Sequence, residues 1–248
     1  MPPAADGAKA GDATRIGRRV GDAFAAVLGD RLVALAAYGS SVDGSFLPGF
    51  SDLDLAFFIH GRIEVEDAVG VQRLLQDLGP DPFDYLQAKF ADIDEAPRPT
   101  LVPGSFAMIR GRIPDPAYIH DETSLRAVGF ATLAGVVARI EDDKVPWAIA
   151  AGPARRRRLV RLMMTRLKPA TRALLVEQGE PVLTTWRAGW GDLAPRWRVR
   201  NPEAAGAMDS LLAALPPRTR EAELFCGETI LGLLTHIEGA SPDPARRP

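Results

Sequence analysis

The sequence predicts an α+β protein, in which a small domain built on a mixed sheet is followed by an all-α helical bundle domain. Two observations lead to this prediction. Up to about residue 115, short apolar runs of strand length alternate with segments of helical spacing. Beyond Pro114 and Pro116, the apolar spacing is helical almost throughout. We therefore expect one domain over residues 13–115 and a second over residues 118–240, with the boundary near residues 112–120.

The first domain is expected to contain two helices and four strands. Apolar residues at helical spacing predict helices over residues 13–28 and 65–78. Nearly continuous apolar runs predict strands over residues 32–38, 53–59, 83–90 and 106–110. The segment from Gly39 to Gly49 is rich in Gly and Ser and contains Pro48, so it is expected to be a loop.

The second domain is expected to be made of helices over residues 125–140, 159–176, 208–215 and 224–237. Gly and Pro residues separate these segments. Trp186 and Trp190 are four residues apart, which predicts that they share a helix face. Core packing and a stacking wall for a substrate ring are both compatible with that spacing.

Composition and charge narrow the class of protein. The 248 residues carry a net charge of -2, and polymer-binding domains usually carry a basic excess, so the balance does not favour a nucleic-acid substrate. The single cysteine, Cys226, allows neither an intramolecular disulfide nor a cysteine-based metal cage. The sequence has no signal-peptide pattern and no apolar run of about 18 residues, so we expect a cytoplasmic protein without a membrane partner.

Two carboxylates at the start of the second predicted strand point to metal chemistry. Residues two apart on a strand project from the same face, so Asp52 and Asp54 are expected to lie side by side. Two adjacent negative charges repel unless a cation lies between them. Carboxylate oxygens suit Mg²⁺, which keeps several waters and takes substrate phosphates as its other ligands.

The turn after the first predicted strand has the composition of a phosphate-binding turn. Gly39 lets the backbone approach a ligand without a Cβ clash, and Ser40 adds a hydroxyl donor. Exposed backbone N–H groups in such a turn can hold phosphate oxygens. Because the turn and the two aspartates fall at the ends of neighbouring strands, phosphates and metal ions are expected to meet there.

A third carboxylate, Asp84, is flanked by Phe83 and Tyr85 in the third predicted strand. If this strand lies beside residues 53–59, Asp84 faces the same metal ions. It would then either bind a metal or accept a proton from the attacking hydroxyl.

The segment Tyr38-Gly39-Ser40, eleven further residues and then Asp52-Leu53-Asp54 resembles the signature of the DNA polymerase β-type nucleotidyltransferase superfamily. Ser51, directly before the first aspartate, is also usual there. The plan of a small nucleotidyltransferase domain followed by a helical domain resembles the aminoglycoside nucleotidyltransferases. The specific part of the resemblance covers about residues 30–90.

The resemblance implies that Gly39 and Ser40 contact a nucleoside triphosphate, and that Asp52 and Asp54 bind Mg²⁺. Two ions are expected, because a pair of metals would stabilise the attacking and leaving oxygens. It also implies that Asp84 is the third carboxylate. The antibiotic-modifying members often have Glu at that position. The shorter Asp favours metal ligation over long-reach base catalysis, and both roles stay open.

A basic stretch in the second domain supplies a further candidate. It runs from Arg155 to Arg158 and continues with Arg161, Arg166 and Lys168. One interpretation is a solvated helix face, and the other is a contact with substrate phosphates. Lys168 is the best single candidate for binding the nucleotide, because a lysine is a point charge that suits a mobile triphosphate.

The resulting functional prediction is a Mg²⁺-dependent nucleotidyltransferase. It would move a nucleoside monophosphate from ATP or another triphosphate to a hydroxyl of a small molecule, for which an aminoglycoside-like antibiotic is one candidate. The protein would act as a monomer or homodimer. The alternatives are a transferase that attaches AMP to a protein or an RNA end, and a non-catalytic nucleotide-binding regulatory protein.

Overall fold

The computed structural model describes residues 6–79, 83 and 85–241. By its internal contacts the chain divides into two compact units, Met1–Asp121 and Glu122–Pro248. The first unit holds a mixed four-stranded sheet, and the described part of the second is helical. The predicted α+β class, with a small mixed sheet followed by a helical region, is therefore confirmed.

The sheet of the first unit has the strand order β3-β2-β1-β4. The central strands β1 (Leu32–Tyr38) and β2 (Leu53–Ile59) pair antiparallel. The strand β4 (Phe106–Arg110) runs antiparallel to β1, and β3 (Leu86–Asp92) runs parallel to β2. The central pair is almost fully buried, as its continuous apolar sequence predicts.

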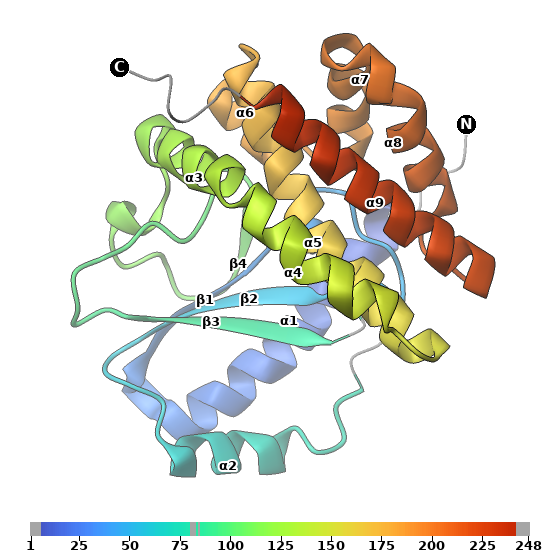
Figure 1. Cartoon of the computed structure of the whole chain (residues 1–248). Coiled ribbons are helices and arrows are strands. Elements are labelled where there is room, and N and C mark those ends of the chain that lie inside the picture. The colour runs from blue at the N-terminus through green and yellow to red at the C-terminus, as the bar shows by residue number, and fades with distance from the viewer. Residues whose placement is uncertain (1–5, 80–82, 84, 242–248) are drawn as a thin grey trace. The chain divides into compact units, whose positions relative to one another are not determined.

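Two helices, α1 (Asp6–Leu28) and α2 (Val65–Leu74), cover one face of this sheet (Figure 1). Ile16 and Val20 of α1 pack with Leu55 and Phe57 of β2 in the main core of the unit. The rings of Phe57 and Phe90 stack, with centroids 4.9 Å apart, and so join β3 to the same core. The helix α1 begins seven residues earlier than the sequence predicts, and α2 ends four residues earlier.

The opposite face of the sheet is lined by small residues and carries a smaller core. Ala36 and Ala56 are fully buried there, together with Phe58. The segment between β3 and β4 and the turn beyond β4 contribute Leu101 and Tyr118 to this cluster. This face of the sheet is therefore lined by alanines, and the longer side chains of β1, β2 and β3 that point to it lie around them.

The third strand differs from its prediction over residues 83–90, because β3 spans Leu86–Asp92 and Phe83 lies in a bend. The parallel pairing begins at Leu53↔Leu86, where β2 itself begins. The ring of Phe83 packs against that of Phe46 in the core, with centroids 4.8 Å apart, and this contact explains why an apolar residue stands at position 83. Its hydrophobicity reflects tertiary packing and not membership of the strand.

The described part of the second unit contains seven helices: α3 (Glu122–Ala134), α4 (Val136–Ala148), α5 (Pro153–Glu177), α6 (Val182–Arg187), α7 (Trp190–Arg200), α8 (Pro202–Ala214) and α9 (Arg220–Ala240). The single helix predicted over residues 125–140 is wrong, because the chain breaks at Gly135 into α3 and α4. The predicted shared face of Trp186 and Trp190 is also wrong. Ala188 and Gly189 separate α6 from α7, so the two tryptophans lie on different helices.

Among the described residues, no single helix is both long and apolar enough to cross a membrane, and α3 with α4 passes that test only as a pair bent by 52°.

Helices α5 and α9 are joined by a buried ion pair. Arg156 Nε lies 3.1 Å from Glu223 Oε2, and the side chains of these residues are 12% and 7% exposed. A second ion pair in this unit, between Arg198 and Asp209, has a similar separation of 2.9 Å but side chains that are 56% and 43% exposed. The two ion pairs have similar nitrogen–oxygen distances but differ in how far they are buried.

We expect Glu223→Gln to lower the free energy of unfolding by about 3 kcal/mol, because it leaves the buried guanidinium of Arg156 without its counter-charge. The matched change Asp209→Asn removes a carboxylate charge from the solvated pair and should cost less than about 1 kcal/mol. Urea unfolding followed by circular dichroism measures both. Equal losses for the two variants would contradict the assignment of the Arg156–Glu223 pair as buried.

Candidate active site

The groups of the candidate site gather at one end of the sheet. Gly39 directly follows β1, and Asp52 directly precedes β2, in which Asp54 is the second residue. Because β1 and β2 are antiparallel, the end of one strand lies beside the start of the other, and Tyr38 pairs with Asp54. The parallel strand β3 starts at this same end, since the backbone N–H of Leu53 donates to the carbonyl of Tyr85 at 3.0 Å.

Alternation along β2 assigns Asp54 to the face of the sheet opposite α1 and α2. Its neighbours Leu53 and Leu55 belong to the core beneath the helices. Ala56, two residues further on, belongs to the cluster on the other face. Asp54 lies on the side of Ala56, and its side chain is partly exposed.

Gly39 makes the closest approach to this carboxylate. A Cβ built on Gly39 would lie 2.4 Å from Asp54 Oδ2, and the glycine has a φ of +74°. Both facts exclude an ordinary side chain at this position. The backbone of the turn therefore runs directly against the carboxylate, as the sequence predicts for a glycine that admits a close contact.

The loop from Gly39 to Ser51 is held by its own hydrogen bonds. The carbonyl of Gly39 accepts from the N–H groups of Val42 and Asp43, both at 3.0 Å. At the other end of the loop, Leu47 donates to Ser51 Oγ at 2.9 Å, and the Ser51 N–H donates back to the Leu47 carbonyl at 2.9 Å. These bonds fix the loop that connects the glycine turn to Asp52.

The serines of this loop are engaged differently. Ser41 Oγ donates to the carbonyl of Tyr38 at 3.2 Å, and Ser51 Oγ accepts from Leu47 as described. Within the described residues, the hydroxyl of Ser40 makes no hydrogen bond. The hydroxyl that the sequence assigns to a phosphate is thus available for a ligand.

The described structure does not test the placement of two predicted site residues. Asp84 lies outside the described residues, so its role as third carboxylate stays a prediction. Lys168 lies on α5 in the second unit, where its Nζ is 6.0 Å from the centre of the Trp190 ring. Its role as a nucleotide contact also stays a prediction.

The basic stretch around Lys168 is mostly engaged within the second unit. Arg156 pairs with Glu223, and Arg161 is buried. Arg166 forms an ion pair with Asp143, whose pKa is raised because the carboxyl is buried. Part of the stretch therefore serves packing within the helical unit. Arg155, Arg157 and Arg158 are exposed, and a contact of the stretch with substrate phosphates stays a prediction.

Three polar side chains, those of Gln87, Lys89 and His120, were not singled out as site residues from the sequence. Gln87 pairs with Asp54 across the parallel ladder, and Lys89 stands two residues further along β3. The Lys89 Nζ lies 5.3 Å from the centre of the Tyr38 ring. The pKa of His120 is lowered, first by burial, and the positive charge of Lys89 adds to that effect. Strand alternation indicates such positions only once the register of β3 is known.

The pKa of Tyr38 is raised, first because the side chain is buried and then because the negative charge of Asp54 disfavours a phenolate. Tyr38 therefore stays a neutral phenol across the physiological pH range. The influence of Asp54 on this pKa agrees with the pairing of the two residues across the β1–β2 ladder.

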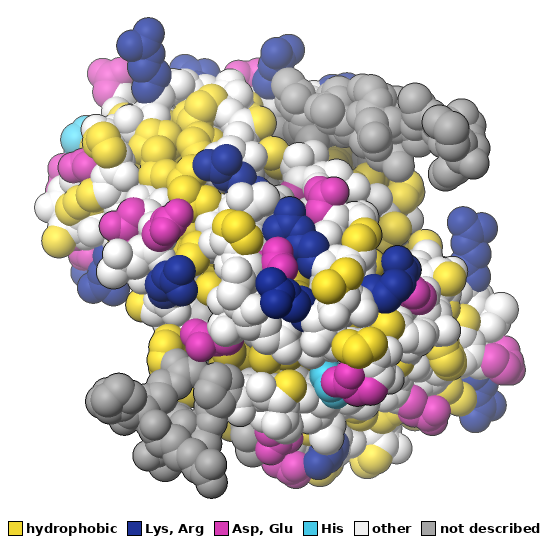
Figure 2. Space-filling view, turned by 90° about the horizontal axis from the view of Figure 1, so that it is seen from above, with side chains coloured by type: hydrophobic (Ala, Val, Ile, Leu, Met, Phe, Trp, Pro, Cys, Tyr) yellow, Lys and Arg dark blue, Asp and Glu magenta, His cyan; other side chains and the backbone are white. Residues whose placement is uncertain are grey.

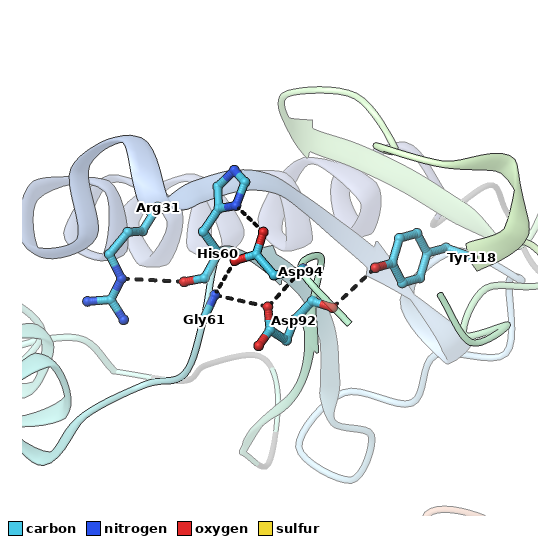
Figure 3. Close-up of polar contacts among 6 residues, drawn as sticks. All are labelled: Arg31, His60, Gly61, Asp92, Asp94 and Tyr118. Carbon is cyan, nitrogen blue, oxygen red and sulfur yellow. Dashed lines mark hydrogen bonds and ion pairs between the residues drawn. The ribbon is translucent and has the colours of Figure 1, made fainter. Parts of the chain in front are cut away.

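The far end of the β2–β3 pair is closed by a different polar cluster (Figure 3). Asp92 Oδ1 accepts from the N–H groups of Gly61 at 2.9 Å and Asp94 at 3.0 Å. His60 Nδ1 lies 2.8 Å from Asp94 Oδ1, and the Tyr118 hydroxyl donates to the Asp92 carbonyl at 3.3 Å. These contacts hold the ends of the parallel strands together and so maintain the register that puts Asp54 beside Gln87.

No model of a known protein family matches this chain, and no curated protein matches it. The chemical character of the site therefore has to be judged from its own groups. Asp52 is buried, with 8% of its surface exposed, and it is separated from Asp54 by one residue. Asp54 is partly exposed, and among the described residues no group of three or more His, Cys, Asp or Glu is placed to hold a metal ion, so a fit to Mg²⁺ rests on the oxygen chemistry of these two carboxylates.

The contact between Gly39 and Asp54 can be tested with a matched pair of glycines. Gly44 lies in the same loop with a φ of +78° but has no atom within 4 Å of a built Cβ. Gly44→Ala should therefore cost about 1 kcal/mol of unfolding free energy, from backbone strain alone. Gly39→Ala should cost about 1–3 kcal/mol more, because the added methyl meets the carboxylate.

Chemical denaturation measures both variants against the wild-type protein. Equal losses for Gly39→Ala and Gly44→Ala would show that the backbone does not approach Asp54 as closely as described.

Proposed function

We propose that this protein is a Mg²⁺-dependent nucleotidyltransferase that acts on a small molecule. The observation that carries the proposal is the close approach of the glycine turn to the carboxylate of Asp54. A Cβ built on Gly39 would lie only 2.4 Å from Asp54 Oδ2. A turn that offers backbone N–H groups and a free hydroxyl suits phosphate oxygens. Carboxylates beside it suit the cation that accompanies a triphosphate.

In the proposed reaction, an acceptor hydroxyl attacks the α-phosphorus of a nucleoside triphosphate, with ATP as the first candidate. A bond forms between the acceptor oxygen and phosphorus, the bond to the pyrophosphate oxygen breaks, and the acceptor loses its proton. Asp52 and Asp54 would hold Mg²⁺, which when bound neutralises the charge on the phosphate oxygens. Gly39 and Ser40 would orient the triphosphate for in-line attack.

Asp84 is the group that we propose to take the proton or to complete the metal site, on the strength of the sequence resemblance alone. Its chain neighbour Phe83 packs against Phe46 of the glycine loop, with ring centroids 4.8 Å apart. Its other neighbour, Tyr85, accepts a hydrogen bond from Leu53, the residue between the two aspartates. Both flanking residues thus belong to the end of the sheet that carries the site.

A small-molecule acceptor is favoured over a nucleic acid by the distribution of charge. The net charge is -2. On the face drawn in Figure 2, Lys and Arg side chains are interspersed with acidic and apolar ones. A long nucleic acid gains most of its affinity from a basic excess, which the net charge does not provide.

We expect Asp54→Asn to reduce pyrophosphate release by at least about 10³-fold while leaving the fold intact, because the amide removes a charge that the metal requires. The matched control is Asp209→Asn, which removes a carboxylate from the solvated pair with Arg198 and should retain wild-type turnover. The assay follows pyrophosphate release with Mg²⁺, each of the four common nucleoside triphosphates, and a panel of hydroxylated antibiotics and metabolites.

Wild-type turnover in a folded Asp54→Asn protein would overturn this mechanism. Binding of a Mg²⁺–nucleotide complex without pyrophosphate release from any acceptor would point instead to a non-catalytic nucleotide-binding protein. Covalent AMP on a partner protein would shift the proposal to the protein-modifying alternative.

A further inference from the structure

We infer that Lys89 is the cation of the first unit that binds the phosphates of the nucleotide, with the ring of Tyr38 as the platform that positions it. This inference rests on the proposed nucleotidyl transfer and adds to it a binding residue that neither the glycine turn nor the two aspartates supply. It also offers an alternative to Lys168, which belongs to the other unit.

The register of the sheet places Lys89 on the same face as the carboxylate. Asp54 pairs with Gln87, and Ala56 pairs with Lys89. Lys89 therefore lies two residues further along β3 than Gln87, on the same face of the sheet as Asp54. The opposite side of β3 is identified by Phe90, whose ring stacks on Phe57 of the helix-covered core. Lys89 therefore points away from the helices α1 and α2, as Asp54 does.

The ammonium group of Lys89 lies over the ring of Tyr38, the residue before Gly39. Its Nζ lies 5.3 Å from the centre of the Tyr38 ring, which is within the range of a cation–π contact. Tyr38 is the direct cross-strand partner of Asp54 and the residue before Gly39. The platform thus holds the positive charge over the strand that leads into the predicted phosphate turn.

Over the part of the chain that the structure describes, Lys89 forms no ion pair, and its side chain is exposed. The phenol of Tyr38 is neutral and cannot supply the missing negative charge. His120, which lies near both Lys89 and Asp121, has a pKa that is lowered first by burial, and it is therefore neutral at physiological pH. An anion bound at this face would meet an unneutralised ammonium group.

A solvated surface lysine is the plainer explanation of an exposed ammonium, and Lys144 is an example of one. Its Nζ lies 2.5 Å from Glu141 Oε1, one turn away on α4. Lys89 differs in two ways: among the described residues it has no carboxylate in ion-pair contact, and its ammonium group lies over an aromatic ring beside the candidate site. A lysine in that place suits phosphate oxygens, which it contacts as a point charge.

The test compares Lys89→Gln with Lys144→Gln in the full-length protein. With ATP and Mg²⁺, we expect Lys89→Gln to lower kcat/KM for the nucleotide by about 10- to 100-fold, because one charge-assisted contact is lost. Lys89→Arg should recover most of the activity because it keeps the charge. Lys144→Gln should match the wild type, and all three should unfold at the wild-type temperature because both lysines are exposed.

Salt dependence separates a phosphate contact from a structural role. The wild-type KM for the nucleotide should rise between low salt and about 1 M salt, where the Debye length falls to about 3 Å. This rise should be shallower in Lys89→Gln, which has already lost the charge. For the platform, Tyr38→Phe keeps the ring and should keep the activity, whereas Tyr38→Leu should lower it and add little to Lys89→Gln.

The outcomes distinguish this inference from the function on which it rests. If the wild-type protein binds no Mg²⁺–nucleotide and releases no pyrophosphate, both fail. If the wild type is active and Lys89→Gln is equally active with an unchanged salt dependence, the inference about Lys89 alone is overturned. A large loss in Lys168→Gln in that case would assign the phosphate contact to the second unit.

Discussion

Antiparallel pairing between β1 and β2 brings together the glycine turn and the aspartates of the candidate site. The Tyr38↔Asp54 pair brings the end of one strand to the start of the other. From this one pair it follows that the turn after β1 meets the carboxylates of β2, and that a glycine is needed where the two meet. A slip of the register by one residue would turn Asp54 toward the apolar core and remove it from the turn. The contacts at the far end of β2 and β3 protect against such a slip.

Much of the fold could be predicted because the strands are bounded by clear signals. The runs that form β1, β2 and β4 are apolar, and a glycine directly follows β1 and β4, so their limits are correct in the prediction. The third strand begins later than its apolar run predicts, because Phe83 belongs to the core through its contact with Phe46 and not to the strand. In the helical unit, Gly135 lies inside a continuous helical pattern, and periodicity alone does not show that it divides two helices.

The candidate site could be predicted only as far as local sequence reaches. Gly39, Ser40, Asp52 and Asp54 lie within sixteen residues, and alternation with turn chemistry is enough to relate them. Lys89 and Gln87 depend on a parallel register that is set through the crossover containing α2, which the sequence pattern does not specify. His120 reaches the same face because the backbone at Leu101 bridges to Ile119, a pairing between two irregular segments. Side chains brought together by such long-range contacts carry no periodic signal.

The separation along the chain of the strands that meet at the site has a consequence for folding. The β1–β2 hairpin closes a loop of fourteen residues, and so the glycine turn can meet Asp54 at a small entropic cost. The pairing of β1 with β4 must wait for a segment some 70 residues further on, and β3 joins through a crossover. The groups assigned to metal and phosphate are therefore brought together by contacts between residues close in the sequence. Lys89 reaches its position only when the whole sheet has formed. A nascent chain would assemble its carboxylates and turn before it could orient the charge that we assign to the nucleotide.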